Sequence, residues 1–284
     1  AIRSFVPEDY LEVVATFARS AGGSYQGTWF RGDRPEPKAK RLPVDGAEAG
    51  LVVARAKGGR AEVQSAQAET GRTPPPLLYD LTELQRHANR LHGFAASKTL
   101  GLAQALYEQH KLISYPRTDS RHLSQDVAAT LGDVARAIQG PYRELLAPDT
   151  FTRPLTRRFV DDARVTDHHA IIPTPTTAEG LGLSADERKV YDLICRRLLA
   201  AWHADHVFAV TTVITAIQTP GVIDRYHSSG TTVEQIGWKV LEVARAPRSE
   251  GKREEEAQDL PSGLAAGEPL AVTQAEAVAR KTRP

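Results

Sequence analysis

The sequence predicts an α+β protein, in which a mainly helical domain is inserted into a discontinuous, antiparallel β-rich domain. Apolar residues alternate with polar ones near both ends of the chain, as half-buried strands require. In the middle of the chain, apolar residues recur with the spacing of one helix face. A run of prolines at 74–76 separates these patterns, because consecutive prolines continue neither a helix nor a central strand. We therefore expect residues 74–205 to form the helical domain and residues 1–73 and 206–284 to form the β-rich one.

The first segment contains three candidate strands and one candidate helix. Residues 10–18 are rich in Val, Tyr and Phe, and residues 24–30 form a second, short strand candidate. Residues 60–69 alternate weakly, as a surface strand does. Between them, Asp45 is a candidate cap for a helix that stops at the glycine pair 58–59.

The middle segment begins with two candidate helices. Thr82 and Gln85 have the spacing of a capping box, in which each side chain bonds a backbone N–H of the first turn. We expect this helix to stop at Gly93. The next helix is expected to begin at Ser97 and to end near His110, just before the segment discussed below.

Two further helices complete the middle segment. One is predicted from about residue 124 to residue 138. Ser184 and Glu187 form a second capping-box pair, which opens a long helix through Trp202. The only cysteine, Cys195, lies on this helix among apolar residues, so we expect a reduced thiol in the core.

The last segment returns to strands. Candidates are residues 207–217, 222–226, 238–243 and 269–279. The polar stretch 246–263 contains a run of three glutamates and is interpreted as a mobile connection rather than a metal site.

Bulk composition limits the class of protein. The chain has 284 residues with 36 basic and 35 acidic side chains, a net charge of +1, so any contact with DNA must come from local arrangement. One cysteine excludes an internal disulfide framework and a zinc ribbon within this chain. No apolar run approaches the about 20 residues of a membrane span, and no signal peptide opens the chain. The absence of methionine fits an internal piece of a larger protein, although N-terminal processing also explains a start at Ala1.

The most informative stretch is residues 112–121, Leu-Ile-Ser-Tyr-Pro-Arg-Thr-Asp-Ser-Arg. Pro116 biases Tyr115 toward an extended conformation, and in an extended segment Arg117 projects to the same side as Tyr115. A phenol beside a guanidinium suits attack on a phosphodiester, because the cation neutralises charge on the phosphate. Taken alone, the run is more commonly an ordinary turn with a solvated Arg–Asp pair.

Three motifs together resemble the type IA DNA topoisomerases, and the Tyr-Pro-Arg form resembles topoisomerase III more than topoisomerase I. Residues 112–121 match the active-site motif of that family. Residues 165–174, Val-Thr-Asp-His-His-Ala-Ile-Ile-Pro-Thr, resemble its histidine motif, and residues 74–85 resemble the start of its tyrosine-bearing domain. The motifs occur in the order of the family, which makes the match specific.

The resemblance implies a chemistry for three residues. Tyr115 would attack one DNA strand to form a 5′-phosphotyrosyl intermediate, and the released 3′-hydroxyl would later reverse the step. Arg117 would hold the scissile phosphate with a bidentate geometry that lysine cannot copy. His168 would organise the phosphate region or the bound DNA. The bond energy is conserved in the intermediate, and the sequence contains no Walker-type loop for ATP.

Other residues of the motifs are candidates for DNA contact. By resemblance these are Thr118, Ser120, Arg121, Lys111 and His169. Each of the two cations is individually more often a solvated surface charge, and a packed, backbone-bonded imidazole is the commoner role for a residue such as His169. Asp119 is expected to shape the turn through hydrogen bonds to the backbone.

The resemblance also implies what lies outside the chain. In the family, Mg²⁺ is bound by an acidic cluster in an N-terminal domain, and nothing in this sequence resembles that cluster, so we expect no metal site here. The β-rich segments would form the arch of the central hole. We therefore expect a fragment whose partners are single-stranded DNA and the missing metal-binding domain. It would be cytoplasmic, associated with DNA and not with membranes, and unable to relax supercoiled DNA by itself.

Alternative functions make different demands on the sequence. A nicking relaxase holds its metal with two histidines that flank a hydrophobic residue, whereas His168 and His169 are adjacent. A tyrosine recombinase needs an Arg and a His-x-x-Arg ahead of its tyrosine, whereas here the histidines follow it. A non-catalytic clamp for single-stranded DNA stays open for the isolated chain, although such binders combine a basic groove with stacking aromatics and only 6% of the residues are aromatic.

Overall fold

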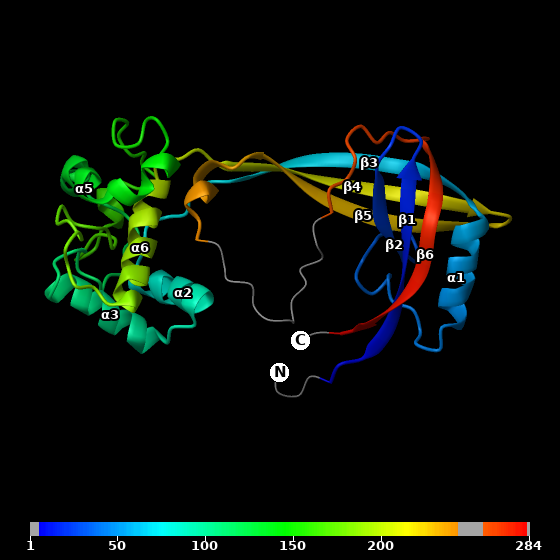
Figure 1. Cartoon of the computed structure of the whole chain (residues 1–284), viewed down its shortest axis with the longest axis horizontal. Coiled ribbons are helices and arrows are strands. Elements are labelled where there is room, and N and C mark those ends of the chain that lie inside the picture. The colour runs from blue at the N-terminus through cyan, green and yellow to red at the C-terminus, as the bar shows by residue number, and fades with distance from the viewer. Residues whose placement is uncertain (1–5, 244–257, 283–284) are drawn as a thin grey trace. The chain divides into compact units, whose positions relative to one another are not determined.

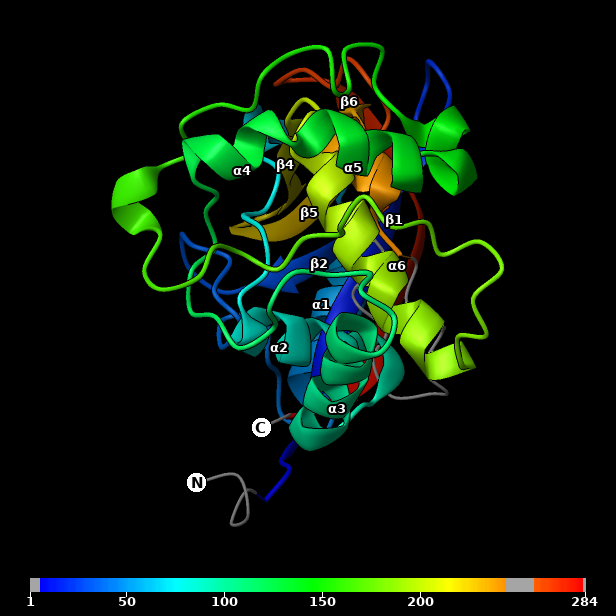
Figure 2. The ribbon, with the colours of Figure 1, turned by 90° about the vertical axis from the view of Figure 1, so that its left-hand side faces the viewer.

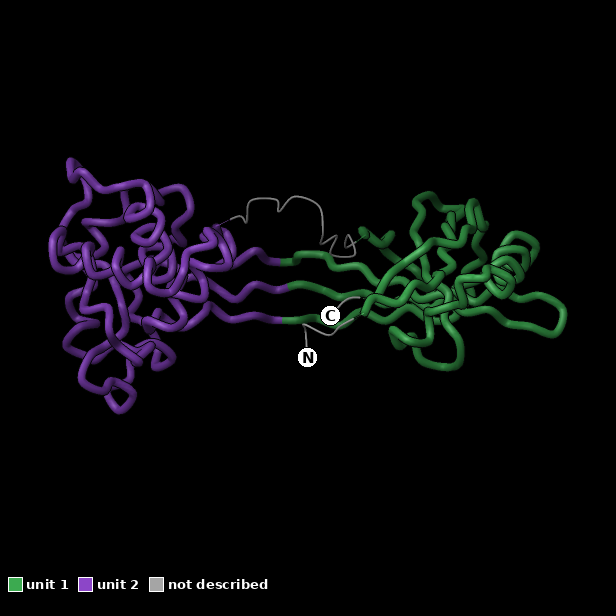
Figure 3. Tube along the Cα trace, turned by 90° about the horizontal axis from the view of Figure 1, so that it is seen from below, with its two compact units in different colours: residues 1–71, 208–234, 253–284 green, residues 72–207, 235–252 purple. Residues whose placement is uncertain are grey.

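The chain combines helices with antiparallel sheet in two compact units. The computed structural model describes residues 6–243 and 258–282. The first unit comprises residues 1–71, 208–234 and 253–284, and the second comprises residues 72–207 and 235–252 (Figure 3). The first unit is built mainly from strands and the second mainly from helices. The predicted mixture of helix and antiparallel strand is thereby confirmed.

The strands form a closed barrel in the order β1-β2-β5-β4-β3-β6 (Figure 1). β1 pairs antiparallel with both β2 and β6, β2 with β5, and β3 with β6. Closure pairs β3 with β6 and β2 with β5 over two or three residue pairs, so these contacts join the two ends of the sheet over a short length. The strands of the described residues are β1 (Asp9–Arg19), β2 (Ser24–Phe30), β3 (Arg60–Thr73), β4 (His206–Thr219), β5 (Val222–Gln235) and β6 (Pro269–Lys281).

The barrel core follows from the alternation seen in the sequence. On β1, every second residue of the run Val13, Ala15 and Phe17 is fully buried, as a half-buried strand requires. The Phe17 ring lies 5.5 Å from that of Tyr25 and 5.4 Å from that of Tyr226, centroid to centroid. These aromatic contacts join three different strands, so the barrel interior is packed with side chains.

A helix packs against the outside of the barrel strands β1 and β6. α1 (Ala47–Gly58) contacts β6 and β1, and its buried alanines and valine join the barrel core (Figure 1). The predicted cap was wrong by one position, because the residue before the helix is Gly46 with a φ of 76°, which favours glycine. Asp45 still contributes, since its carboxylate accepts a 3.1 Å hydrogen bond from the N–H of Ala47.

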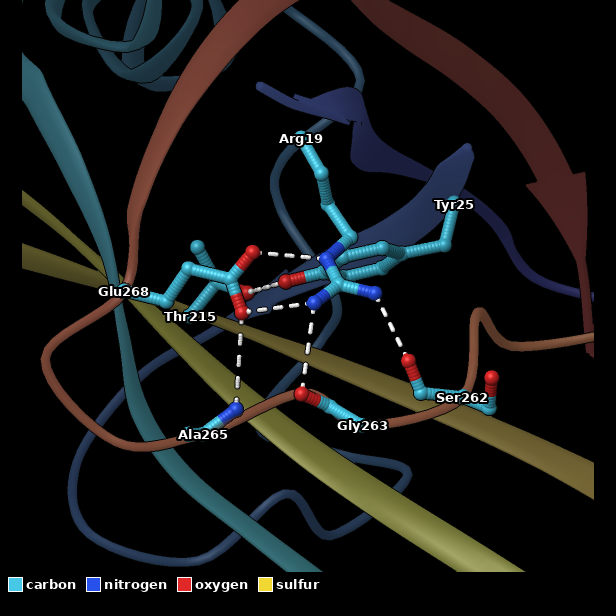
Figure 4. Close-up of polar contacts among 7 residues, drawn as sticks. All are labelled: Arg19, Tyr25, Thr215, Ser262, Gly263, Ala265 and Glu268. Atoms are coloured by element: carbon cyan, nitrogen blue, oxygen red, sulfur yellow. Dashed lines mark hydrogen bonds and ion pairs between the residues drawn. The ribbon is translucent and has the colours of Figure 1, made fainter. Parts of the chain in front are cut away.

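An ion pair fastens the segment that precedes β6. Arg19 donates from Nε to Glu268 at 2.6 Å, and its terminal nitrogens donate to the carbonyls of Ser262 and Gly263 (Figure 4). Beside this pair, the Tyr25 hydroxyl shares a 2.8 Å hydrogen bond with Thr215 (Figure 4). The guanidinium holds the pKa of the Glu268 carboxyl below its usual value. This fork of charge-assisted bonds therefore ties residues 262–268 to the end of β1.

The second unit is organised around α6 (Ala185–Ala200) (Figure 2). Leu193 and Ile194 on this helix pack into one hydrophobic cluster with α2 and α3, and Cys195 and Leu198 pack into another with α5. Cys195 is buried and its pKa is raised by burial, which confirms the predicted core thiol. The other helices of this unit are α2 (Leu81–His92), α3 (Ala96–Glu108), α4 (Gln125–Ala129) and α5 (Leu131–Ile138), with 3₁₀ turns η2 (Gly140–Leu145), η3 (Asp162–Arg164) and η4 (Gly237–Leu241).

Some predicted helix ends are confirmed and others are wrong. The capping box of Ser184 and Glu187 is present with both hydrogen bonds, at 3.2 Å and 2.7 Å. The box predicted at Thr82 is wrong, because Asp80 occupies the cap and its carboxylate accepts from the N–H of Glu83 at 2.6 Å. Asp80, two positions earlier, accepts from an N–H of the first turn that has no partner inside the helix, so the helix starts sooner. Gly93 ends α2 with a φ of 70°, as expected.

Other boundaries also differ from the predictions. The helix predicted at 124–138 is two helices that meet at Thr130, and α3 begins at Ala96 rather than at Ser97. The strand predicted at 238–243 is wrong: this segment forms η4, where the indole of Trp238 donates a 2.9 Å hydrogen bond to the carbonyl of Thr73. Most of the loop predicted at 246–263 lies outside the described residues. None of the described helices is long and apolar enough to span a membrane.

Candidate active site

The loop that follows α3 presents Tyr115. Lys111 turns the chain with a φ of 57°, an uncommon value for a residue with a side chain. Leu112 and Ile113 are then fully buried in the cluster that also contains α3, which anchors the backbone immediately before the tyrosine. Tyr115 is half-buried, and Arg117 is exposed.

Ser114 joins the tyrosine loop to the histidine motif. Its N–H donates to the carbonyl of Ile172 at 2.9 Å, and its hydroxyl donates to the carbonyl of Ala170 at 3.1 Å. The same hydroxyl accepts from the N–H of Ile172 at 3.0 Å. A further bond, from the N–H of Thr174 to the carbonyl of Leu112 at 2.9 Å, extends the pairing. The two motifs are therefore held in a fixed antiparallel register, like two short strands.

Tyr115 and His168 are in direct ring contact. Their ring centroids lie 4.4 Å apart at an interplanar angle of 47°. Tyr107, on α3, meets Tyr115 edge to face at 5.5 Å. His168 is exposed, so one face of the pair is open to solvent. The phenol is thus held by two aromatic neighbours while remaining accessible to a substrate.

Two buried hydroxyls that follow Tyr115 in the chain bond the loop to the segment around His168. Thr118 is 8% exposed, and its hydroxyl donates to the carbonyl of His168 at 3.0 Å. Ser120 is 4% exposed, and its hydroxyl donates to the carbonyl of Arg164 at 2.8 Å. Asp119 accepts from the hydroxyl of Thr166 at 2.9 Å, a side-chain contact with the histidine motif rather than the expected hydrogen bond to the backbone of its own turn. These bonds fix the position of the loop around His168.

The cations of the motif differ in their surroundings. Arg117 makes no ion pair or hydrogen bond with any residue that the structure describes, so its guanidinium is available to a ligand. Arg121, in contrast, donates to the carbonyls of Leu78 and Leu77 at 3.0 and 3.3 Å. Lys111 is exposed, with its ammonium 5.7 Å from the centroid of the Tyr107 ring.

His169 faces inward, unlike its neighbour. Its Nδ1 donates to the carbonyl of Ala170 at 2.8 Å. Burial lowers the pKa of His169, and the adjacent His168 lowers it further, against the opposing effect of the Ala170 hydrogen bond. His169 is therefore a neutral, backbone-bonded imidazole near neutral pH.

The described part of the chain offers no cluster of three or more His, Cys, Asp or Glu side chains that could hold a metal ion. The carboxylates near the tyrosine loop are dispersed, as Asp119 bonds Thr166 and Asp161 caps η3. A divalent cation such as Mg²⁺ needs several oxygen ligands around one point. These residues do not fit such an ion.

Sequence reasoning missed two contributors to the site. Ser114 lies inside the recognised motif, but its cross-link to residues 170–172 depends on a segment far along the chain. Tyr107 reads as part of the buried stripe of its helix, and only the folded chain shows that its ring meets Tyr115. The position of Ser114 next to Tyr115 could have marked it as part of the site. Nothing in the sequence distinguishes Tyr107 from an ordinary core residue.

The whole chain is similar to known proteins. A family model described as DNA topoisomerase covers residues 1–284. DNA topoisomerase 3 of Shouchella clausii is 33% identical over 287 residues, and that of Bacillus subtilis is 34% identical over 285 residues; each alignment covers 100% of this chain. DNA topoisomerase 3 of Bacillus cereus is 44% identical over 167 residues, which cover 58% of this chain and 22% of that protein.

A solved structure shares the fold. Full-length topoisomerase I from Thermotoga maritima superposes with a TM-score of 0.61 at 20% identity, over 100% of this chain and 42% of that one. The chain spans 37% of the length of the Shouchella clausii and Bacillus subtilis relatives. The motifs around Tyr115 and His168, the family model and the relatives agree, so this chain belongs to the type IA DNA topoisomerase family and is similar to topoisomerase 3 members of that family.

Proposed function

We propose that this chain supplies the nucleophile with which a type IA topoisomerase opens one DNA strand. The Oη of Tyr115 forms a bond to the phosphorus of a phosphodiester, and the bond from that phosphorus to the 3′ oxygen breaks. The downstream strand is left attached to Tyr115 through its 5′ phosphate. The phenol proton passes to water, and the 3′ oxygen takes up a proton from water and leaves as a hydroxyl. After another strand has passed, the 3′-hydroxyl attacks the phosphotyrosine and restores the DNA and the phenol.

The observation that carries this proposal is the contact between Tyr115 and His168, with an exposed Arg117 two residues after Tyr115 in the chain. A phenol is protonated at neutral pH, so attack needs its proton to be removed and the phosphate charge to be offset. The Arg117 guanidinium supplies the second requirement as a fork of donors to two phosphate oxygens. We assign His168 the positioning of the phenol and the scissile phosphate.

The remaining motif residues divide into two groups. We infer that Lys111, which is exposed beside Tyr107, contacts a DNA phosphate near the site. Polar atoms of three other residues donate to backbone carbonyls: the hydroxyls of Thr118 and Ser120 and the Nδ1 of His169. We therefore assign these residues to holding the loop in the position that DNA needs, and not to hydrogen bonds with the DNA itself.

The activity of the whole enzyme needs parts outside these residues. We propose that Mg²⁺ is held by another domain of the same polypeptide, and that the strand-passage cycle takes place on a single-stranded DNA segment in the cytoplasm. The helical unit would be an insertion into the β-rich arch. Because the chain spans 37% of its relatives, we expect the isolated chain not to relax supercoiled DNA, even with Mg²⁺ present. Mg²⁺-dependent relaxation of supercoiled DNA by the purified chain would contradict the proposal that another domain must supply the metal site.

A chimera tests the nucleophile directly. The 284 residues replace the matching segment of Bacillus subtilis DNA topoisomerase 3, and the product is incubated with a single-stranded oligonucleotide labelled at its 3′ end. We expect label to travel with the protein on a denaturing gel, and an oligonucleotide labelled at its 5′ end to leave none. Tyr115→Phe is expected to abolish the adduct.

Tyr107→Phe is the matched control, because it removes a neighbouring phenol hydroxyl but keeps the ring that packs on Tyr115. It should retain the adduct. If Tyr115→Phe forms the adduct as well as the unsubstituted chimera does, the assignment is wrong. If the unsubstituted chimera binds DNA without forming an adduct, the chain is a single-strand clamp instead.

A further inference from the structure

A second polar site lies in the helical unit, apart from the residues proposed to cleave DNA. It is a pocket of about 170 Å³ whose lining includes none of Tyr115, Arg117 and His168. Arg197 of α6 and Arg121 of the loop after α3 both line it. Neither guanidinium makes an ion pair with a carboxylate among the residues that the structure describes.

Arg197 is a buried cation with only neutral partners. It is 8% exposed, and its Nη1 donates to the carbonyl of Leu77 at 2.8 Å. Its Nη2 donates to Nδ1 of His87 at 3.3 Å, and the guanidinium carbon lies 3.9 Å from the centroid of the Tyr79 ring. Buried charges in proteins are ordinarily paired with an opposite charge, because an uncompensated one is costly to desolvate.

Arg121 brings a second positive charge to the same point. Its Nη2 donates to the carbonyl of Leu77, the acceptor that Arg197 also uses. A guanidinium carries more N–H donors than these bonds occupy, so both groups retain donors for a ligand. Two like charges that share one carbonyl repel each other unless an anion lies near them.

The described lining of the pocket carries more arginines than carboxylates, and none of these carboxylates is in direct contact with Arg121 or Arg197. Arg196 forms an ion pair with Asp192 at 2.8 Å, so the charges of these two side chains offset each other. Arg90, Glu83 and Glu242 also line the pocket, and neither glutamate forms an ion pair with Arg121 or Arg197 within the described ranges.

His87 adds no charge of its own. Its Nδ1 accepts from both the Tyr79 hydroxyl and Arg197, so that nitrogen carries no proton. Burial, followed by the nearby Arg197 and Arg90, lowers the pKa of His87 to about 4. The imidazole is therefore neutral near pH 7, and its lowered pKa agrees with a positive potential at this place.

We propose that this pocket binds a phosphate group through Arg197 and Arg121. A volume of about 170 Å³ is below the roughly 300–1,000 Å³ of pockets for drug-sized molecules, so it suits a small anion and not a large organic ligand. Paired guanidiniums provide the planar, multiple donors that phosphate oxygens accept. The phosphate belongs either to a DNA strand, as an anchor apart from the cleavage site, or to a free anion. The site does not depend on cleavage by Tyr115.

Calorimetric titration of the 284-residue chain with inorganic phosphate tests the site, with a short oligothymidylate and phosphate-free thymidine as parallel ligands. Arg121→Gln is expected to weaken phosphate binding about tenfold or more, since it removes one charge-assisted contact. Glu83→Gln removes a carboxylate from the lining and should tighten binding about threefold. Arg136→Gln is the matched control, because Arg136 is exposed on α5 and should leave the affinity unchanged. Circular dichroism checks that each variant is folded.

The two sources of phosphate give different results. If Arg121→Gln weakens oligothymidylate and phosphate alike, and phosphate displaces the oligonucleotide, the occupant is a DNA phosphodiester. If only phosphate is affected, the occupant is a free anion. The proposal would be overturned if the unsubstituted chain did not bind phosphate. It would also be overturned if the unsubstituted chain, Arg121→Gln and Glu83→Gln bound phosphate with equal affinity.

Discussion

The ring of Tyr115 contacts the ring of His168 at 4.4 Å between centroids, although the two residues belong to different loops of the chain. Ser114 fixes the register of these loops on one side of the contact, and Thr118 fixes the backbone of His168 on the other. The relative placement of phenol and imidazole therefore depends on hydrogen bonds between segments distant in sequence.

Replacing His168 should slow DNA cleavage without unfolding the chain. His168 is exposed and contacts Tyr115, so His168→Ala removes a positioning group and little buried surface. We expect single-turnover adduct formation in the chimera to slow about 10- to 100-fold. His169→Gln serves as the comparison, because His169 bonds a backbone carbonyl and faces inward; its effect should be on stability more than on rate. Equal rates for His168→Ala and the unsubstituted chimera would contradict the role.

Removing the Ser114 hydroxyl should weaken the register between the two motifs. Ser114→Ala leaves the N–H of Ile172 and the carbonyl of Ala170 without this partner, at a cost of about 1–3 kcal/mol in the free energy of unfolding. Adduct formation should slow while DNA affinity stays nearly constant, because Arg117 and Lys111 are untouched. Ser114→Thr restores a hydroxyl and should recover most of the rate. Failure of Thr to recover it would show that the hydroxyl itself is not what matters.

The helical unit should lose stability in mild acid through His87. The pKa of His87 in the folded chain is about 4, below its ordinary value near 6.5. Between these values the unfolded chain binds more protons, so the contribution is complete above pH 6.5 and is lost as the pH falls toward 4. Because His87 is partly exposed, we expect a loss on the order of 1–2 kcal/mol. Urea denaturation of His87→Gln should show a flatter pH dependence than the unsubstituted chain; parallel curves would exclude His87 as the source.

A methyl group at Gly71 should destabilise the barrel. A Cβ built there would lie 2.5 Å from the ring of Phe208, too close for the neighbouring strand to accommodate without a shift. Gly71→Ala is therefore expected to lower the free energy of unfolding by about 1–3 kcal/mol. Gly58→Ala is the control, because nothing lies within 4 Å of its added methyl and the helix favours alanine. The two variants should shift the urea midpoint in opposite directions, and a loss of stability in both would contradict the packing argument.

Short-range patterns were the reliable part of sequence reasoning. The capping box at Ser184, the helix end at Gly93 and the alternation on β1 are all confirmed, since each involves neighbours within a few residues. Errors arose where a competing local residue or a distant partner decided the outcome. Asp80 displaced the cap expected at Thr82, and Trp238 joined a 3₁₀ turn bonded to Thr73 instead of a strand.

By itself, the sequence determined the mixture of strands and helices, the run of residues around Tyr115 and the histidine motif, and through them the family. The tertiary structure alone decided that the strands close into a barrel, that Ser114 and Tyr107 hold the segment around Tyr115, and that Arg121 and Arg197 converge on one carbonyl. The reason is physical. Period and capping are properties of adjacent residues, whereas closure, register and the meeting of two guanidiniums depend on which distant segments satisfy one another's hydrogen bonds.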